Sequence, residues 1–402
     1  MMAETGQIVN GIWRIEHRVG RGTFCELYQA TNQKDGSKAA VKVETAGMEG
    51  SVLKWEREVL EAIQSLGDSV PKYYWYGDLG NSTRKALVMQ LLGGEDLSRM
   101  RSRQRAARGR LPLTLVCSLV NQMLDCLEGL HKCGFLHRDV KPSNFVRASN
   151  DSRTFVMIDF GLCKKYMSAS GGVRPERAHA EFRGTSAYAS LHTHDGRDQG
   201  RRDDLASLVY VALDLYMGGL PWTRAARARD KAEVARLKRR FMHEPERLGG
   251  DPGVLVPLAG LAQFCYGMSY AQEPDYDYFR VQLRNLAARY PPGPEDPPFS
   301  WDPPPLPSRH GGDHRGSRRG RSHKEKEEEE DLDADSGGTY SVGSASASSE
   351  GEKEVKEGGE ESDLPPNNLH RLPSSAASGA FSSGGFPGGG SPKGKEEGAG
   401  RG

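Results

Sequence analysis

The sequence predicts an α+β fold in which a small, β-rich region comes first and a larger, helical region follows. Residues 13–43 contain short strand-like segments separated by turns, whereas residues 113–133 and 204–217 carry apolar side chains at helical spacing. From about residue 291 the chain is rich in Pro, Gly, Ser and charged residues, which cannot bury a core. We therefore expect two lobes followed by a disordered tail.

Composition sets limits on the function. The chain has 402 residues, of which 36% are hydrophobic and 27% charged, so it is too long for one ordinary domain and too polar for one uniform globule. Residues 1–290 hold 42 Lys and Arg against 33 Asp and Glu, while residues 291–402 hold 13 against 21. A basic ordered region suits anionic ligands such as nucleotide phosphates or acidic protein segments, although a solvated surface produces the same excess.

The cysteines and the N-terminus bear on location. No C-x-x-C pair occurs, and three of the six cysteines fall in an apolar helical stretch, so we expect reduced thiols and an intracellular protein. Residues 1–6 show no basic segment followed by an apolar run, and no window reaches the roughly 18 apolar residues of a membrane span. We expect a soluble, cytoplasmic protein with no membrane partner.

The β-rich region carries a glycine-rich turn. Strand-like residues 15–19, 27–30 and 39–44 flank Gly20-Arg21-Gly22-Thr23-Phe24. Because glycines lack a Cβ, backbone N–H groups can approach phosphate oxygens there, but ordinary hairpin turns use the same residues. Lys42 strengthens the phosphate interpretation, because an ammonium on an apolar strand is unfavourable without an anionic partner.

One helix is predicted inside the β-rich region. Residues 51–66 place apolar side chains at helical spacing and include three glutamates. Glu56 lies within a turn of the apolar residues, so we expect it to point inward and pair with Lys42, while the other two face solvent. A buried strand at 86–89 then leaves the lobe through the connector 90–94.

The helical region leads the chain to its polar motifs. The predicted helix 113–133 ends just before His137. The helix 204–217 is apolar on nearly every side, and we expect a buried core helix capped by Asp204. Between them, residues 162–203 are rich in Gly, Arg and Ser and have the character of a long functional loop.

Two polar motifs point to one chemistry. His137-Arg138-Asp139-Val140-Lys141-Pro142-Ser143-Asn144 is followed, after a possible hairpin of residues 145–146 and 155–158, by Asp159-Phe160-Gly161. Phosphoryl transfer requires an aspartate that accepts the proton of a hydroxyl and a lysine that neutralises the phosphoryl group. It also requires an amide and a second carboxylate that hold Mg²⁺. His137-Arg138-Asp139 or Asp159-Phe160-Gly161 alone can occur by chance in a solvated loop, but the two motifs rarely occur together in this order.

The tail divides into a Pro-rich stretch, residues 291–307, and a low-complexity segment, residues 308–402. The second part includes Arg318-Arg319-Gly320-Arg321 ahead of an acidic run at 325–335. We interpret this cluster as a solvated charge block paired loosely with the acidic run, with a nuclear-import or RNA-contact patch as the alternative.

Taken together, the glycine-rich turn, Lys42, Glu56, residues 137–144 and Asp159-Phe160-Gly161 resemble, in order, the signature set of the eukaryotic protein kinases. Finer features resemble the casein kinase 1 group, namely Gly184-Thr185, Tyr188-Ala189-Ser190, Arg201-Arg202-Asp203-Asp204-Leu205 and Gly219-Leu220-Pro221-Trp222. Within that group, further stretches are similar to tau-tubulin kinases, namely residues 137–145, Val173-Arg174-Pro175, Phe182-Arg183-Gly184-Thr185 and Pro298-Phe299-Ser300-Trp301-Asp302. The resemblance covers about residues 12–302.

The resemblance implies a bilobal serine/threonine kinase that uses ATP and Mg²⁺. It would have an N-terminal extension at 1–11 and a kinase domain at 12–290, with lobes of about 12–90 and 95–290. The catalytic set would be Lys42, Glu56, Asp139, Lys141, Asn144, Asp159 and Thr185, of which Asn144 and Asp159 would be the metal ligands. The nucleotide-binding set would be Val19, Gly20, Arg21, Gly22, Thr23, Phe24, Cys25, Glu26, Leu27, Ala40, Lys42, Met89, Gln90 and Leu92.

The resemblance also implies individual roles. Lys42 would hold the α- and β-phosphates, Asp139 would be the catalytic base, and Lys141 would lie beside the γ-phosphate. Met89 would occupy the gatekeeper position, and residues 90–92 would be the hinge that binds adenine. Lys141 together with the Thr185 of the catalytic set favours Ser/Thr over Tyr acceptors.

Two positions depart from the family pattern. Cys25 stands where the third loop glycine is usual; if that position needs a positive φ, the Cβ costs on the order of 1 kcal/mol and raises the KM for ATP. Ala187 stands where an arginine is usual, which predicts a weaker preference for acceptors that are already phosphorylated nearby, unless Arg183 or Arg202 compensates.

We favour an active, monomeric kinase that acts on Ser or Thr hydroxyls of acidic or cytoskeletal proteins and has no nucleic-acid partner. We expect a cytoplasmic location, with nuclear import as a further hypothesis. The alternative is a pseudokinase scaffold with impaired nucleotide use because of Cys25. A third hypothesis makes the Cys25 thiol a redox or electrophile-sensitive switch; the simpler interpretation is a tolerated small residue, because no adjoining cation favours the thiolate.

Overall fold

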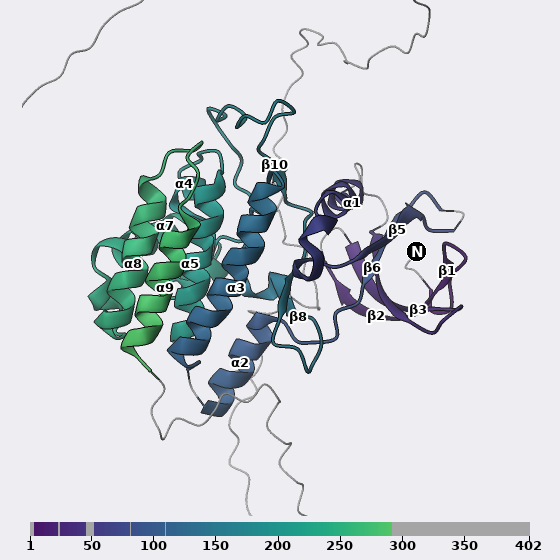
Figure 1. Cartoon of the computed structure of the whole chain (residues 1–402), viewed down its shortest axis with the longest axis horizontal. Coiled ribbons are helices and arrows are strands. Elements are labelled where there is room, and N and C mark those ends of the chain that lie inside the picture. The colour runs from purple at the N-terminus through teal and green to yellow at the C-terminus, as the bar shows by residue number, and fades with distance from the viewer. Residues whose placement is uncertain (1–3, 23–24, 46–51, 81, 109, 292–402) are drawn as a thin grey trace, which may run out of the picture. The chain divides into compact units, whose positions relative to one another are not determined.

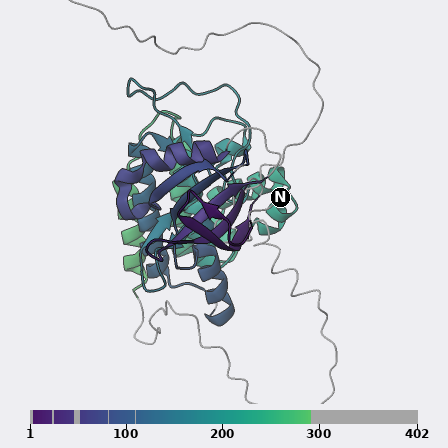
Figure 2. The same ribbon diagram turned by 90° about the vertical axis from the view of Figure 1, so that its right-hand side faces the viewer.

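The computed structural model describes residues 4–22, 25–45, 52–80, 82–108 and 110–291. Over these residues the chain forms a β-rich lobe followed by a helical lobe, which confirms the predicted α+β fold (Figure 1). Seen from the side of the first lobe, its sheet lies in front of the helices (Figure 2). Thr23 and Phe24 of the glycine-rich turn, most of the Pro-rich stretch 291–307 and the whole segment 308–402 lie outside the described residues.

A six-stranded antiparallel sheet forms the first lobe, in the order β1-β2-β3-β4-β6-β5. The strands are β1 (Ile8–Val9), β2 (Trp13–Arg21), β3 (Cys25–Asn32), β4 (Lys38–Glu44), β5 (Tyr73–Asp78) and β6 (Lys85–Gln90). Because side chains alternate along a strand, β4 places Ala40 and Lys42 on one face and Val41 and Val43 on the other. Only the second face is a purely apolar layer in β4.

One α-helix, α1 (Val52–Ala62), packs against β5 and β6. It buries Leu53, Glu56, Val59 and Leu60, which form one stripe at three- and four-residue spacing. The helix is shorter than the predicted 51–66, because the chain continues as the 3₁₀ helix η1 (Gln64–Ser69), which contains a glycine at positive φ. Glu56 therefore lies on the buried face, as its sequence position predicts.

The connection between the lobes is held by two backbone hydrogen bonds. The N–H groups of Gly93 and Gly94 donate to the carbonyl oxygens of Ala148 and Arg147 at 3.1 and 3.3 Å. A Cβ at Gly94 would lie 2.3 Å from the Cβ of Arg147, so a larger residue would push the connector away from the second lobe. The glycines thus fix the path of the chain beside the predicted hinge.

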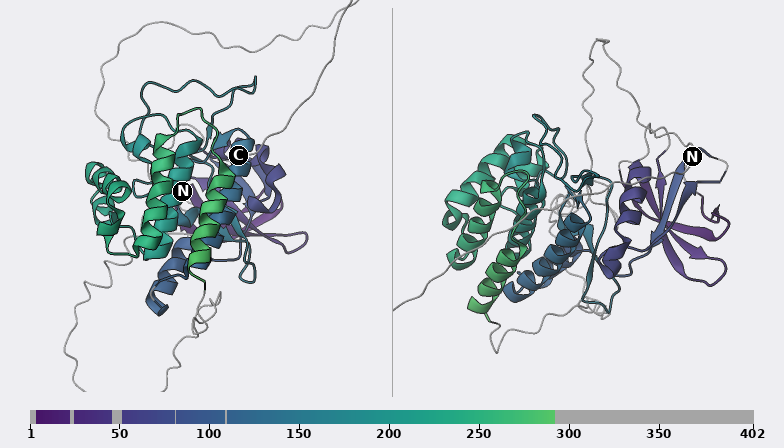
Figure 3. Two further views of the ribbon diagram at one scale, coloured as in Figure 1. Left: turned by 60° about the vertical axis from the view of Figure 1, so that its left-hand side comes forward. Right: turned by 45° about the horizontal axis from the view of Figure 1, so that its top comes forward.

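The helical lobe is built around α5. Its helices are α2 (Leu97–Arg108), α3 (Leu113–Lys132), α4 (Leu191–His194), α5 (Arg201–Met217), α6 (Thr223–Arg227), α7 (Lys231–His243), α8 (Pro252–Gly267) and α9 (Tyr276–Arg289), with a 3₁₀ turn η3 (Pro245–Leu248). Helix α5 packs against α3 and α8, and α3 also packs against α9 (Figures 1 and 3). Since α5 is buried from Arg201 to Leu215, it is the core helix that its apolar sequence predicts.

Helix α3 is also long and apolar enough, by length and composition, to cross a membrane, with a mean hydropathy of 1.2 over its best window. The sequence analysis expected no such segment. In the described residues, however, α3 packs against α5 and α9 and buries ten of its side chains, so its position is that of a core helix.

The start of α5 corrects one prediction. The helix begins at Arg201, and Asp203 rather than Asp204 closes its N-terminus by accepting a hydrogen bond from the Gly200 N–H at 2.7 Å. Asp204 lies further inside the helix, where its carboxylate binds another part of the chain.

Short strands position the polar motifs. β8 (Phe145–Arg147) and β9 (Phe155–Met157) form the predicted hairpin, directly after the 3₁₀ turn η2 (Pro142–Asn144). β7 (Phe135–Leu136) pairs with β10 (Lys164–Lys165). These two pairs place residues 137–144 beside the segment that contains Asp159.

Leu213 tests the role of α5 as the core of the helical lobe. Its side chain is 0% exposed, so Leu213→Ala is expected to lower the free energy of unfolding by about 2–5 kcal/mol. Urea unfolding followed by circular dichroism measures this change. Val281→Ala on α9, where the side chain is 38% exposed, is the control and is expected to change it by less than about 0.5 kcal/mol. Equal effects of the two substitutions would contradict the assignment.

Candidate active site

A buried ion-pair group joins the two lobes. The Nζ atom of Lys42 lies 2.5 Å from Oε1 of Glu56 on α1 and 3.3 Å from Oδ1 of Asp159 in the second lobe. Burial alone would lower the pKa of Lys42, but the charges of Asp159 and Glu56 outweigh it and raise the pKa. The ammonium therefore stays protonated, between two carboxylates.

The position of α1 has a second support. Trp55, the neighbour of Glu56, donates from Nε1 to the carbonyl oxygen of Cys163 at 2.9 Å. The pKa of Glu56 is raised, chiefly by burial, against the pull of Lys42, so this carboxylate relies on Lys42 to remain ionised. The helix is thus tied to the segment after Asp159 both by the buried charges and by an indole hydrogen bond.

Asp139 is the centre of a second cluster. One carboxylate oxygen, Oδ1, accepts hydrogen bonds from the backbone N–H and the hydroxyl of Thr185, both at 2.8 Å. The other, Oδ2, lies 2.9 Å from Nζ of Lys141. Burial alone would raise the pKa of Asp139, but Lys141 and the Thr185 hydroxyl hold it below its usual range. The carboxylate is therefore ionised at neutral pH and fixed in orientation.

The buried Asp204 of α5 holds the loop that carries Asp139 by hydrogen bonds. The carboxylate of Asp204 accepts the backbone N–H groups of His137 and Arg138, each at 2.8 Å, and lies 2.9 Å from Nε2 of His131. These bonds hold Arg138 at φ 66°, a left-handed conformation that is unfavourable for a residue with a Cβ. The backbone that leads into Asp139 is therefore specified by a buried carboxylate more than sixty residues away.

Gly184 lets Thr185 reach this loop. Its φ is 96°, and a Cβ there would lie 2.3 Å from the carbonyl oxygen of Arg138. Only glycine allows the two backbones to approach so closely, and the contact between Thr185 and Asp139 depends on this approach.

Asn144 and Asp159 supply oxygens suited to a magnesium ion. The Nδ2 group of Asn144 donates to the carbonyl oxygen of Asp139 at 2.8 Å, which leaves its Oδ1 atom buried and without a hydrogen-bond partner in the described residues. A buried amide oxygen without a partner is unfavourable unless a cation completes it, so the residues present fit the ion. Within the described residues no group of three or more His, Cys, Asp or Glu could hold a metal. An ion at Asn144 and Asp159 would therefore take further ligands from phosphates.

The segment around Asp159 is also locally strained. Asp159 has φ 66°, and the following Phe160 ring is buried edge-on against the His137 ring, with centroids 6.0 Å apart. The imidazole of His137 bonds the carbonyl oxygen of Ile158 through Nε2 at 3.1 Å. These contacts over-determine the backbone at Asp159 and aim its carboxylate at Lys42.

The predicted adenine-site residues gather in one apolar cluster. Leu27, Ala40, Met89 and Leu92 are buried together, and Val19 packs against the same cluster. Gln90 lies between them in sequence, and its side-chain oxygen accepts from the N–H of Lys72 at 3.2 Å. The cluster places an apolar surface on the sheet face that also carries Lys42, as a nucleotide base next to its phosphates requires.

The glycine-rich turn is closed by a hydrogen bond from the Gly22 N–H to the Cys25 carbonyl oxygen at 2.8 Å. Cys25 is not among the described residues with positive φ, so the backbone strain anticipated for it is absent. Its side chain is buried against Leu53 and Leu87. Burial raises the pKa of the Cys25 thiol although Lys42 opposes it, which disfavours a reactive thiolate.

Among the described members of the predicted nucleotide-binding set, Glu26 turns away from the site, and Nε of Arg21 lies 4.0 Å from its carboxylate. Strand alternation turns it to the opposite sheet face from Cys25 and Leu27, where its Oε2 accepts from the Tyr28 hydroxyl at 2.9 Å and Oε1 lies 3.4 Å from Arg18. The side chain is therefore directed away from Lys42, and a contact with nucleotide would have to come from its backbone.

The segment 185–190 follows Thr185 and is bound inward at several points. The Trp222 indole donates from Nε1 to the Ala187 carbonyl oxygen at 2.7 Å, and the Tyr188 hydroxyl donates to Oδ2 of Asp214 at 2.7 Å. Arg202 is 1% exposed and donates to the Met268 carbonyl oxygen at 2.5 Å, so it is not available to replace an arginine at position 187. Arg183 is exposed and pairs only with the exposed Glu181.

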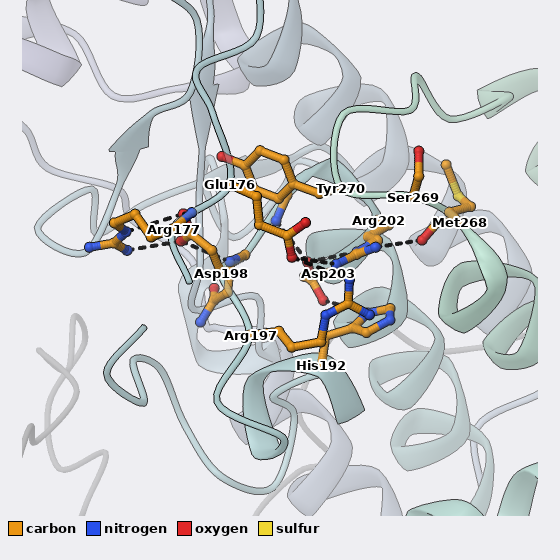
Figure 4. A network of polar contacts seen from close by, with 12 residues as sticks. Glu176, Arg177, His192, Arg197, Asp198, Arg202, Asp203, Met268, Ser269 and Tyr270 are labelled. Carbon is orange, nitrogen blue, oxygen red and sulfur yellow. Dashed lines mark hydrogen bonds and ion pairs between the residues drawn. The ribbon is translucent and has the colours of Figure 1, made fainter. Parts of the chain in front are cut away.

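The loop 162–203 is fastened by charges of the chain itself (Figure 4). Asp198 is 1% exposed and lies 2.7 Å from Nζ of Lys164 and 2.8 Å from Nη2 of Arg177. Burial alone would raise the pKa of Asp198, but Arg177 and Lys164 hold it well below its usual range. Glu176 lies 3.6 Å from Nη2 of Arg202 and ties the same loop to α5.

Sequence reasoning missed the roles of Asp204, Asp198 and Trp55. One signal was present: four charged residues in succession, Arg201-Arg202-Asp203-Asp204, open a helix that is otherwise apolar. Charges at the start of a buried helix must find partners, so they mark the place where loops attach.

A lysine–glutamate pair in the β-rich lobe faces two aspartates and an asparagine in the helical lobe. This is the arrangement of an enzyme that transfers phosphoryl groups. A profile of the protein kinase domain matches residues 13–248, which is more than half of the chain. The chain therefore belongs to the protein kinase family. It is similar to a probable serine/threonine-protein kinase of Dictyostelium discoideum, with 33% identity over 299 residues. That alignment covers 74% of this chain and 58% of the relative, so the chain matches little more than half of the relative's length.

Gly184→Ala tests the close approach of the two loops. The new Cβ would clash with the Arg138 carbonyl oxygen, so we expect a loss of unfolding free energy roughly 1–3 kcal/mol larger than that of Gly196→Ala. Gly196 is the matched control, because its φ is 73° but nothing lies within 4 Å of a Cβ there. Thermal unfolding of the two variants measures the difference. Equal losses would show that the approach at Gly184 does not constrain the loop.

Proposed function

We propose that this protein is an active serine/threonine protein kinase, which transfers the γ-phosphoryl group of ATP to hydroxyls of protein substrates. The observation that carries the proposal is the ionised Asp139 carboxylate, oriented by Thr185 and Lys141 across the site from the Lys42–Glu56 pair. Membership of the protein kinase family supports it.

The residues divide the reaction between them. The acceptor oxygen attacks the γ-phosphorus, the bond to the β–γ bridging oxygen breaks, and ADP leaves with the electron pair, while the hydroxyl proton passes to Asp139. Lys141 neutralises charge on the transferred group, and Lys42, held by Glu56, binds the α- and β-phosphates. A magnesium ion held by Asn144 and Asp159 would supply charge neutralisation at the phosphates.

Lys141 and Thr185 also bear on whether the acceptor is a Ser/Thr or a Tyr hydroxyl. Lys141 donates from Nζ to the Thr185 hydroxyl at 3.2 Å, and this pair beside Asp139 supports Ser/Thr rather than Tyr acceptors. The similarity to a probable serine/threonine-protein kinase is in agreement. We further propose membership of the casein kinase 1 group, on the strength of Gly184-Thr185 and the Arg201–Asp204 run. Closeness to the tau-tubulin kinases is proposed from residues 137–145, 173–175, 182–185 and 298–302.

The proposed substrates are acidic or cytoskeletal proteins, and the proposed setting is a cytoplasmic monomer. The basic excess of residues 1–290 supports acidic substrates. Ala187 supports a weak preference for acceptors that are already phosphorylated, because Arg202 is buried and only the exposed Arg183 remains nearby in sequence.

A pseudokinase scaffold is the competing proposal. It rested on Cys25, whose backbone is unstrained and whose side chain packs into the lobe, so that residue gives no reason for impaired nucleotide use. We therefore retain the enzyme as the proposed function.

Asp139→Asn tests the enzyme. With casein, radiolabelled ATP and Mg²⁺, we expect incorporation to fall at least about a hundredfold, because the amide cannot accept the hydroxyl proton. Asp151→Asn, an exposed position in the β8–β9 turn, is the control and should retain parental activity. Equal label in parent and Asp139→Asn would refute the enzyme, and binding of ATP without turnover in both would favour the scaffold.

Activity without phosphorylation of the loop 162–203 is a second expectation, because Asp198 already neutralises Lys164 and Arg177. Protein treated with a phosphatase should keep more than about half of its casein kinase activity. Asp198→Asn should lose about tenfold or more, because Asp198 is buried and its loss leaves the largely buried Lys164 without its carboxylate and frees the exposed Arg177. Asp195→Asn, in the same loop and paired at the surface with Arg239, is the control. Complete inactivation of the parent by phosphatase would contradict the expectation.

A further inference from the structure

Lys238 on α7 is a buried lysine that has no carboxylate partner among the described residues. Its side chain is 0% exposed, and it makes no ion pair with any carboxylate in the part of the chain that the structure describes. Lys42 and Arg202 are buried almost as deeply, but each lies beside carboxylates, at 2.5 Å for Glu56 and 3.4 Å for Asp203. Lys238 therefore needs a different explanation.

Backbone carbonyl groups take the place of the counter-ion. The Nζ atom of Lys238 donates to the carbonyl oxygens of Ala189 at 2.6 Å and Ser186 at 2.9 Å, and it lies 3.3 Å from Nε2 of His194. The aromatic rings of Tyr210 and Trp222 face the same atom, with centroids 4.7 and 5.6 Å away. The side chain thus reaches from α7 to both ends of the stretch 186–189.

The contacts do not depend on the charge of Lys238. Burial lowers the pKa of Lys238 well below its usual value. A neutral amine still carries two N–H groups, which match the two carbonyl oxygens, and an ammonium adds a third. His194 adds no positive charge to the cluster, because burial and then Lys238 lower its pKa to about 3. What the site requires of position 238 is a long side chain that ends in hydrogen-bond donors.

The stretch held in this way adjoins the proposed catalytic base. Thr185 binds Asp139 directly, and the carbonyl oxygens of Ser186, Ala187 and Ala189 are each bound from the helical lobe. Lys238 binds two of these three oxygens, and Nε2 of His194 also lies 3.3 Å from the Ser186 oxygen. An acceptor hydroxyl that reaches Asp139 has to lie against this stretch, so the path of its backbone shapes the surface that meets the acceptor chain.

We propose that Lys238 is a positioning residue that fixes the segment 185–190 in the shape that receives the protein acceptor. The inference rests on the proposed kinase function, because it concerns the acceptor side of that reaction. Lys238 does not touch the Lys42–Glu56 pair, so its loss should weaken acceptor binding and leave nucleotide binding intact.

Lys238→Met tests the proposal, because methionine keeps most of the length and the apolar stem but has no donor. With the full chain and casein, we expect the KM for casein to rise about tenfold, while the KM for ATP and kcat stay within about twofold. Lys238→Arg restores N–H donors and should recover most of the acceptor KM. Arg240→Met, an exposed position on the same helix, is the matched control and should match the parent.

The outcomes separate this inference from the proposed function. An inactive parent would overturn the kinase, whereas an active parent with an unchanged casein KM in Lys238→Met would overturn only the role of Lys238. Parallel rises in the KM for casein and for ATP would also overturn it, because they indicate general loss of structure. If Lys238→Met does not fold, Lys238→Gln replaces it, because its shorter side chain does not reach the carbonyl oxygens. The same comparison of the KM for casein with the KM for ATP then decides the outcome.

Discussion

The first turn of α5 is the constraint on which the rest of the structure depends. Arg201, Arg202, Asp203 and Asp204 are all buried, and together they bind three other segments of the chain. The two arginines donate to the carbonyl oxygens of Ala271 and Met268, while the two aspartates accept from Ser190 and Gly200 and from the backbone of His137 and Arg138. Removing one member of a buried set of this kind typically costs about 3–5 kcal/mol. Three segments of the chain, around residues 137–138, 190–200 and 268–271, are therefore fixed relative to one helix.

This arrangement explains how a strained active-site backbone persists. Arg138 and Asp159 both have φ 66°, which local sequence does not favour. Arg138 is held by Asp204 through its N–H and by the carbonyl oxygen of Leu162 through its guanidinium, at 2.8 and 2.7 Å. Leu162 and Cys163 follow Asp159, and Cys163 in turn accepts from Trp55 on α1. A chain of direct contacts thus runs from α5 through Arg138 and the residues just after Asp159-Phe160-Gly161 to the helix that carries Glu56.

Much of the fold and of the site could be predicted from the sequence, because the signals are local. The alternation of β4, the apolar stripe of α1 and the motifs around Asp139 and Asp159 are each contained in a few neighbouring residues. The remaining features are not local. Asp204 meets Arg138 across 66 positions and Lys238 meets Ala189 across 49, and nothing near either residue indicates its partner. Lys238 stands in a run of basic residues that resembles an ordinary solvated helix face. The cost considered for Cys25 depended on a positive φ, as a glycine at its position would allow, but its strand geometry has no positive φ.

The charges near residues 185–190 bear on how the site meets its acceptor. Two of the cations in the loop 162–203, Lys164 and Arg177, are largely neutralised by Asp198, so these two are poor attractants for an acidic chain. Position 187 has no charge, and the donors of Lys238 are consumed by carbonyl oxygens. Arg183, two residues before Thr185, is exposed, and its surface pair with Glu181 is of a kind that contributes less than about 1 kcal/mol. On the proposed function, the backbone shape of residues 185–190 contributes to acceptor recognition beside the charges around it, and Lys238, buried behind that backbone, holds the shape.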